Sequence, residues 1–88
     1  MNRRLKIRAG AVEWRKFEDE VVAVDTRKSV YLAVNKSGSI LWPALLDGAS
    51  RSELVERLVD AFELDQTSAE RDVDDFVQVL DEQDLLEP

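Results

Sequence analysis

Two apolar runs around a polar turn dominate the first half of the chain. Residues 20–34 read EVVAVDTRKSVYLAV, with β-branched, aromatic and aliphatic residues on both sides of the polar stretch at residues 25–28. Such residues fit a pleated, half-buried surface, and two runs around a short turn indicate a β-hairpin. Alternating apolar residues within 9–17 predict an earlier strand. We therefore expect a meander of three antiparallel strands.

Three helical patterns follow the hairpin. The first predicted helix begins near Ser37 or Ser39, its candidate N-caps, contains Pro43, and ends at Gly48. A capping box at residues 50–53 starts a second helix, which runs to about Phe62. The third and longest helix covers about residues 68–84, with Thr67 or Ser68 as its cap. Across these helices we expect the core to include Ile40, Trp42, Leu45, Leu54, Leu58 and Leu80.

The order of these elements, β-β-β-α-α-α, indicates an α+β fold. Three helices with a small three-stranded antiparallel sheet at their side are typical of a winged-helix-like domain. We expect residues 1–8, which are basic, to form a flexible tail, and residues 9–88 to form a single domain.

The strand at residues 30–34 has one side with no partner in the sequence. Only helical patterns follow it, and the strand itself contains no charge and no proline. A free edge exposes unpaired N–H and C=O groups, which a protein either protects or uses to hold another chain. We therefore predict that this edge receives an extended peptide, although a homodimer that pairs two such edges is an alternative.

One flank of the third helix is a candidate wall for a groove beside that edge. At helical spacing, Asp72, Phe76, Val79 and Gln83 form a row next to the buried stripe. Val79 is then apolar where the core does not require it. The alternative is that Val79 is an ordinary surface valine and that Phe76 belongs wholly to the core.

Composition argues against an enzyme or a metal site. The 88 residues contain no cysteine and no histidine, which removes the thiolates, the commonest metal ligand and the commonest general base. The carboxylates of the third helix lack EF-hand spacing, so a solvated acidic face is the simpler interpretation. No nucleophile–base pair or phosphate-binding loop is recognisable. We predict no catalytic residue, no metal and no cofactor.

Charge distribution argues against nucleic acid and membranes as partners. Residues 1–36 carry nine Lys/Arg against five Asp/Glu, whereas residues 37–88 carry three against fourteen, and the net charge is −7. A winged helix that reads DNA needs cations on its recognition helix, and here the predicted helices are acidic. DNA binding remains the alternative that the fold outline suggests. No apolar run approaches the length of a bilayer, and we expect a cytoplasmic protein.

A set of residues in the hairpin and the helices forms a recognisable combination. These residues are Asp25, Tyr31, Gly38, Ile40, Trp42, the run Leu46-Asp47-Gly48, Asp72, Val73, Phe76 and the final Leu85-Leu86. In this combination the chain resembles the PqqD-like proteins, also known as RiPP recognition elements, over about residues 12–86. Two departures are Ser29, where such proteins often carry glycine, and Pro43 in the first helix.

This resemblance implies non-catalytic binding of the leader region of a ribosomally synthesised peptide precursor. The leader would add as a strand to the third strand, beside the third helix. The size of the chain is similar to that of stand-alone proteins of lasso-peptide pathways, which present the precursor to a leader peptidase and a cyclase. The alternative within the family is the pyrroloquinoline-quinone type, a peptide chaperone that acts with a radical enzyme.

The predicted peptide site comprises the edge strand and the flank of the third helix. Either Tyr31 and Ala33 or the alternate set of residues faces the peptide, because the sequence does not fix the register. The predicted binding residues are Val30, Tyr31, Leu32, Ala33, Val34, Asp72, Asp75, Phe76, Val79 and Gln83.

Overall fold

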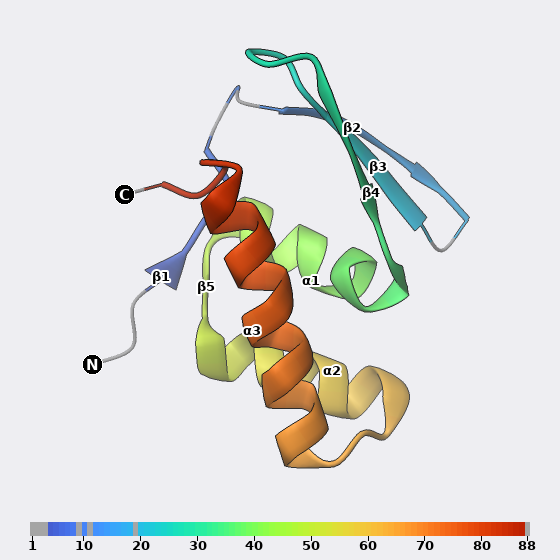
Figure 1. Cartoon of the computed structure of the whole chain (residues 1–88). Coiled ribbons are helices and arrows are strands. Elements are labelled where there is room, and N and C mark those ends of the chain that lie inside the picture. The colour runs from blue at the N-terminus through green and yellow to red at the C-terminus, as the bar shows by residue number, and fades with distance from the viewer. Residues whose placement is uncertain (1–3, 9, 11, 19, 88) are drawn as a thin grey trace.

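A computed structural model of the chain describes residues 4–8, 10, 12–18 and 20–87, without the side chain of Val30. The predicted order of a three-stranded antiparallel sheet followed by three helices is confirmed (Figure 1). Two very short strands are added to it. The elements are β1 (Arg4–Leu5), β2 (Val12–Phe17), β3 (Glu20–Asp25), β4 (Val30–Val34), α1 (Lys36–Asp47), β5 (Ala49–Ser50), α2 (Arg51–Phe62) and α3 (Gln66–Glu82).

The main sheet has the order β2-β3-β4, with β3 in the centre. Val21 pairs with Val34 and Ala23 with Leu32, so these residues share one face of the sheet, and that face packs on α1. Val22 and Val24 lie on the opposite face. The period of two along β3 is visible in its burial, since Val21 and Ala23 are buried while Val22 and Val24 are half-buried.

The core lies between the inner face of the sheet and the three helices. Among the residues predicted for the core, Trp42, Leu45, Leu54, Leu58 and Leu80 are fully buried, which confirms them. Trp42 meets the Trp14 ring edge-on, with the ring centroids 6.2 Å apart, and this contact fastens β2 to α1.

Ile40 was predicted for the core, and that prediction is wrong. The side chain is 38% exposed, because α1 buries the stripe formed by Gly38, Leu41, Trp42 and Leu45, and Ile40 lies beside it. The i, i+3, i+4, i+7 spacing of that stripe is the usual one for a helix packed on a sheet.

The starts of the helices follow local hydrogen bonds. The prediction for α2 is confirmed, with the Ser50 hydroxyl accepting from the Glu53 N–H at 3.2 Å. For α1 and α3 the predicted caps are wrong. Asn35 caps α1, where its side chain accepts from the Gly38 N–H at 2.8 Å, and Asp65 caps α3 by accepting from the Ser68 N–H at 3.2 Å. Each true cap precedes the predicted one, so both helices start earlier.

The structure does not agree with the prediction of a flexible tail at residues 1–8, because residues 4–5 and residue 7 pair with distant segments. Arg4–Leu5 pairs with Ala49–Ser50, and Ile7 forms an antiparallel bridge with Leu86. Leu5 and Ile7 are buried because these two pairings hold their alternating side chains against the core. Residues 1–3, like residues 9 and 11 of the predicted first strand, lie outside the described residues.

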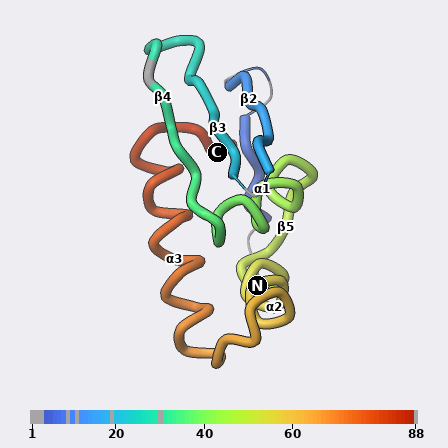
Figure 2. The backbone as a smooth tube through the Cα atoms, turned by 90° about the vertical axis from the view of Figure 1, so that its right-hand side faces the viewer, coloured from blue at the N-terminus to red at the C-terminus, as the bar shows by residue number. Residues whose placement is uncertain are grey.

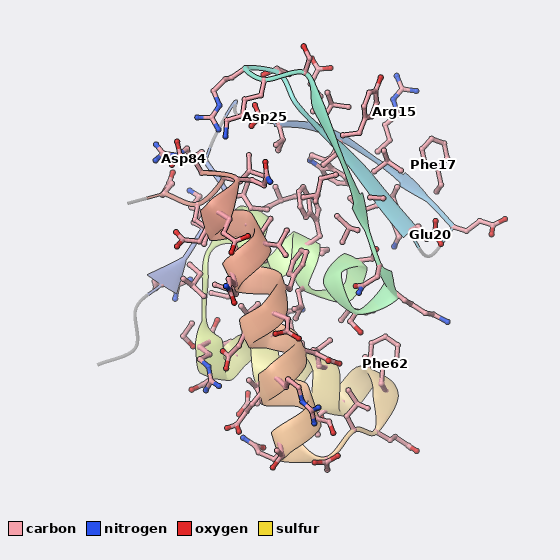
Figure 3. The ribbon with its side chains drawn as sticks, viewed as in Figure 1. Arg15, Phe17, Glu20, Asp25, Phe62 and Asp84 are labelled. Atoms are coloured by element: carbon pink, nitrogen blue, oxygen red, sulfur yellow. The ribbon has the colours of Figure 1, made fainter. Side chains whose placement is uncertain are left out.

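An ion network joins the β3–β4 turn to the C-terminal end of α3. The Asp25 side chain is only 4% exposed and pairs with Arg27 at 3.3 Å. Arg27 also donates to the Asp84 carbonyl at 3.0 Å, and Arg8 reaches the Asp84 carboxylate at 3.0 Å. Asp25 and Asp84 lie at the same end of the molecule (Figure 3). Three distant segments therefore meet at this point.

The turn itself relies on an unusual backbone conformation. Ser29 has a φ of 55° and its N–H donates to the Asp25 carbonyl at 2.8 Å. A φ in this region is one that glycine adopts more readily than serine. No helix in the described part of the chain has both the length and the apolar character that crossing a bilayer requires.

We predict that replacing Gly38 by alanine lowers the stability of the fold. A Cβ at this position would lie 2.5 Å from Val34 Cγ1 and 2.8 Å from Phe76 Cε1. Alanine in an open helix position stabilises by up to about 1 kcal/mol relative to glycine, whereas overpacking costs about 1–3 kcal/mol. Urea denaturation should show that Gly38→Ala is less stable than the wild type, while Lys36→Ala at an exposed position of the same helix changes little. A Gly38→Ala variant of wild-type stability or better would contradict the close packing.

Asp25 is predicted to contribute to a loss of stability in acid. The hydrogen bond from the Arg27 side chain lowers the pKa of Asp25 below its ordinary value of 3.8. A lowered pKa in the folded state means that the stabilisation is complete above the unfolded pKa and is lost as the pH falls through the folded one. Urea denaturation should show Asp25→Asn to be less stable than the wild type at pH 7, with the difference shrinking below pH 3.8. A difference that is constant with pH would exclude this role.

Candidate functional site

A groove of about 360 Å³ separates β4 from α3. Figure 2 shows β4 and α3 on the same side of the molecule, with β2 on the far side of the sheet. The groove combines apolar and polar side chains from β4, the start of α1 and one flank of α3. Its lining residues are Leu32, Ala33, Val34, Asn35, Ser37, Asp72, Asp75, Phe76 and Val79.

The wall on α3 is a stripe next to the buried face of the helix. Ala69, Val73 and Leu80 face the core and are buried. The lining residues Asp72, Asp75, Phe76 and Val79 follow i, i+3, i+4, i+7 spacing, which places them in one row. Phe76 is half-buried, and Val79 is 40% exposed although it is apolar. Val79 therefore faces the groove and not the core.

The wall on β4 is a sheet edge. In the described part of the chain, β4 pairs with β3 on one side and with no strand on the other. Leu32 and Val34 lie on the face of β4 that packs toward the helices. The groove therefore offers unpaired main-chain groups along one wall and an apolar helix flank along the other.

The two ends of the groove are held in different ways. Beside the start of α1, Val34 and Phe76 both approach Gly38 so closely that a Cβ has no room. At the other end, the Lys28 ammonium donates to the Gln83 carbonyl at 3.0 Å, next to the Arg27–Asp84 pair. Packing fixes one end, and exposed polar contacts hold the other.

Three aspartates in the middle of α3 differ in their partners. Asp74 forms a two-pronged pair with Arg51, at 2.7 and 2.9 Å, and this pairing lowers the pKa of Asp74. Asp72 and Asp75 line the groove and have no ion-pair or hydrogen-bonding partner among the described side chains. The acidic end of the groove is therefore uncompensated.

The structure brings seven of the ten predicted site residues into this groove and leaves Tyr31 and Gln83 outside it. The seven are Leu32, Ala33, Val34, Asp72, Asp75, Phe76 and Val79. Gln83 is the C-cap of α3, and its backbone carbonyl accepts a hydrogen bond from the Lys28 ammonium. Val30 lies at the start of the edge, and its side chain is not described. Contact of any of these residues with a peptide stays a prediction.

Tyr31 lies on the other face of the sheet. It pairs with Val24 and is 77% exposed, so it points away from α3. There it borders a hollow of about 230 Å³ with Val22, Val24 and residues of β2. Figure 3 shows Arg15 and Phe17 projecting from β2 away from the helices. The register thus decides between the two predicted faces, and Leu32 and Val34 face the groove.

Asn35 and Ser37 line the groove and were missed in the sequence. Asn35 follows the edge strand directly and caps α1, so its position depends on where that helix starts. An Asn immediately after a strand is the signal that would have pointed to it.

Within the described residues, no three carboxylates or other metal-binding side chains converge on a point where a metal ion would fit.

Comparisons with known proteins agree on one family. The family described as coenzyme PQQ synthesis protein D (PqqD) matches residues 20–86. The solved structure of "TbiB1 in Complex with the TbiA(beta) Leader Peptide" is 32% identical, with a TM-score of 0.82, over 93% of this chain and 94% of that chain. A second, "Lasso peptide synthetase B1 complexed with the leader peptide", is 26% identical with a TM-score of 0.79, over 96% and 98%. No curated protein sequence matches.

Proposed function

The chain belongs to the PqqD family, and we propose that it binds the leader segment of a ribosomally synthesised precursor peptide. The leader adds to β4 as an extra strand and places its side chains in the groove beside α3. The protein then presents the precursor to a leader peptidase and to the enzymes that mature the peptide. It performs no chemistry itself.

The observation that carries this proposal is the free edge of β4 beside an apolar helix flank. An extended peptide satisfies the exposed N–H and C=O groups of such an edge, and each net hydrogen bond contributes about 0.5–1.5 kcal/mol. These bonds are independent of the peptide's sequence. Five residues of β4 provide enough length for several of them.

Side chains of the groove provide selectivity. Leu32 and Val34 on β4 and Phe76 and Val79 on α3 form apolar walls for alternate side chains of the guest. Asn35, Ser37 and the two uncompensated carboxylates form the polar end. The side chains of Tyr31 and Gln83 do not line the groove, so in this proposal they are not part of the side-chain contact.

The lasso-peptide type of pathway has the stronger support. The two similar structures named above are complexes with leader peptides, and one of them is described as a lasso peptide synthetase. Each matches nearly its whole length to this chain. The pyrroloquinoline-quinone type shares the family, and its support is the family match alone.

Val79 provides the first test, because it borders the groove without belonging to the core. Val79→Glu adds a third carboxylate beside Asp72 and Asp75 and removes apolar surface, so we expect the affinity for leader peptide to fall at least about tenfold. Isothermal titration calorimetry with synthetic leaders, starting with the TbiA(beta) leader, measures this effect. Phe76→Glu should act in the same direction.

Gln78→Glu is the matched control for charge and helix. Gln78 is exposed on the same helix and does not line the groove. The control should bind as the wild type does, and circular dichroism should show all three variants folded. Unchanged affinity in folded Val79→Glu would remove the groove from the proposal.

Strand addition makes a separate prediction about the main chain. Amide groups of β4 that point away from β3 exchange freely without a partner and should become protected when leader is added. Hydrogen exchange followed by NMR measures this at single residues. Amides of the β2 edge, at the opposite side of the sheet, should not change. Protection of β2 amides and not of β4 amides would show that the leader binds at the opposite edge of the sheet, which would contradict the proposal.

A further inference from the structure

The groove is chemically different at its two ends. Along α3, the groove residues come in the order Asp72, Asp75, Phe76, Val79, so the two carboxylates precede the two apolar side chains. Because β4 and α3 run in opposite directions, the two carboxylates lie toward Val34 and the start of α1, and Val79 lies toward the start of β4. A guest strand therefore meets negative charge at one end and hydrocarbon at the other.

The negative charge is not neutralised within the described residues. Lys36 and Arg71 are the cations nearest in sequence to this end, and neither forms an ion pair with Asp72 or Asp75. In contrast, Asp74 on the other side of the same helix is held by Arg51. Two carboxylates in a concave surface of a protein with a net charge of −7 repel acidic segments and attract basic ones.

The direction of the guest strand follows from the sheet. All pairs in the main sheet are antiparallel, and an antiparallel guest continues the pattern that is more stable per residue. Such a guest runs opposite to β4. Since Val34 adjoins Phe76 and Lys28 adjoins Gln83, β4 also runs opposite to α3. The guest therefore runs in the direction of α3, from the carboxylates toward Val79.

The spacing between the basic and the apolar residue of the guest follows from the rise per residue of a helix and of a strand. The axial distance along α3 is about 6 Å from Asp75 to Val79 and about 10 Å from Asp72 to Val79, at ~1.5 Å per residue. An extended strand advances about 3.3 Å per residue, and its side chains return to the same face every second residue. These distances correspond to about two and about three strand residues, and only an even spacing keeps both guest side chains on the groove face. A spacing of two residues therefore fits, as does one of four with the reach of a long basic side chain.

We propose that Asp72 and Asp75 make this groove select leaders with a Lys or Arg two or four residues before an apolar side chain. The basic side chain pairs with the two carboxylates, and the apolar one occupies the space beside Leu32, Phe76 and Val79. This inference rests on the proposed function, and it adds the order and the charge of the residues that are recognised.

A randomised display library of 12-residue peptides tests the proposal without knowledge of the natural precursor. Selection on the wild-type protein should enrich sequences with Lys or Arg two or four positions N-terminal to Leu, Ile, Val or Phe. Selection on Asp72→Asn/Asp75→Asn should lose the basic preference and keep the apolar one. The control Asp74→Asn/Asp81→Asn has the same net charge, changes acids that do not line the groove, and should select as the wild type does.

Titration of individual selected peptides gives the magnitude. Replacing the basic residue by Gln should weaken binding to the wild type about fivefold at low salt and have little effect on Asp72→Asn/Asp75→Asn. The difference should fade as the salt concentration rises toward about 1 M. Peptides with the basic and apolar residues exchanged should bind more weakly than the original order.

The outcomes separate this inference from the proposed function. If peptides are enriched and compete at the groove but show no basic preference, the charge inference is wrong and strand addition stands. If both orders bind equally, the assigned direction is wrong. If no peptide is enriched, or if Val79→Glu leaves the selected peptides bound, the proposed function itself fails.

Discussion

The arrangement of the molecule depends on the unpaired main chain of β4. A buried or half-buried backbone group without a partner is costly, so an edge of this kind is tolerated only where water or another chain reaches it. In this protein α3 lies beside the edge and does not close over it. The separation between β4 and α3 is fixed at one end by the packing around Gly38 and at the other by the contacts of Arg27 and Lys28. The width of the groove is therefore set by the helices and the turn, not by the edge itself.

Much of the fold follows from patterns that are local in the sequence. The hairpin, the Ser50 capping box and the buried faces of α2 and α3 depend on neighbouring residues and were predictable. The packing of residues 4–8 was not, because Leu5 and Ile7 alternate over too short a stretch to identify a strand. Their partners, Ala49–Ser50 and Leu86, are distant in the sequence. Ile40 was mispredicted for a different reason, because its exposure depends on which face of α1 packs on the rest of the molecule.

The candidate site shows where sequence reasoning reaches its limit within a strand. The alternation of β4 divides its residues into two faces, but only pairing with β3 decides which face is inside. That pairing turns Leu32 and Val34 toward α3 and leaves Tyr31 on the opposite face. On α3 the periodicity was sufficient, since a single helix fixes the relation of Asp72, Asp75, Phe76 and Val79. Gln83 shared the row but lies at the helix end, where the last turn directs its carbonyl to Lys28.

The position of α3 also has a consequence for the behaviour of the protein at high concentration. An uncharged, proline-free edge is a template on which copies of a chain can polymerise into a continuous sheet. Here α3 stands across the groove from that edge, so a first added strand has room and a further layer meets the helix. The growth of a fibre would thus end after one step. A helix placed across the groove from an edge can thus limit the number of strands that the edge takes up.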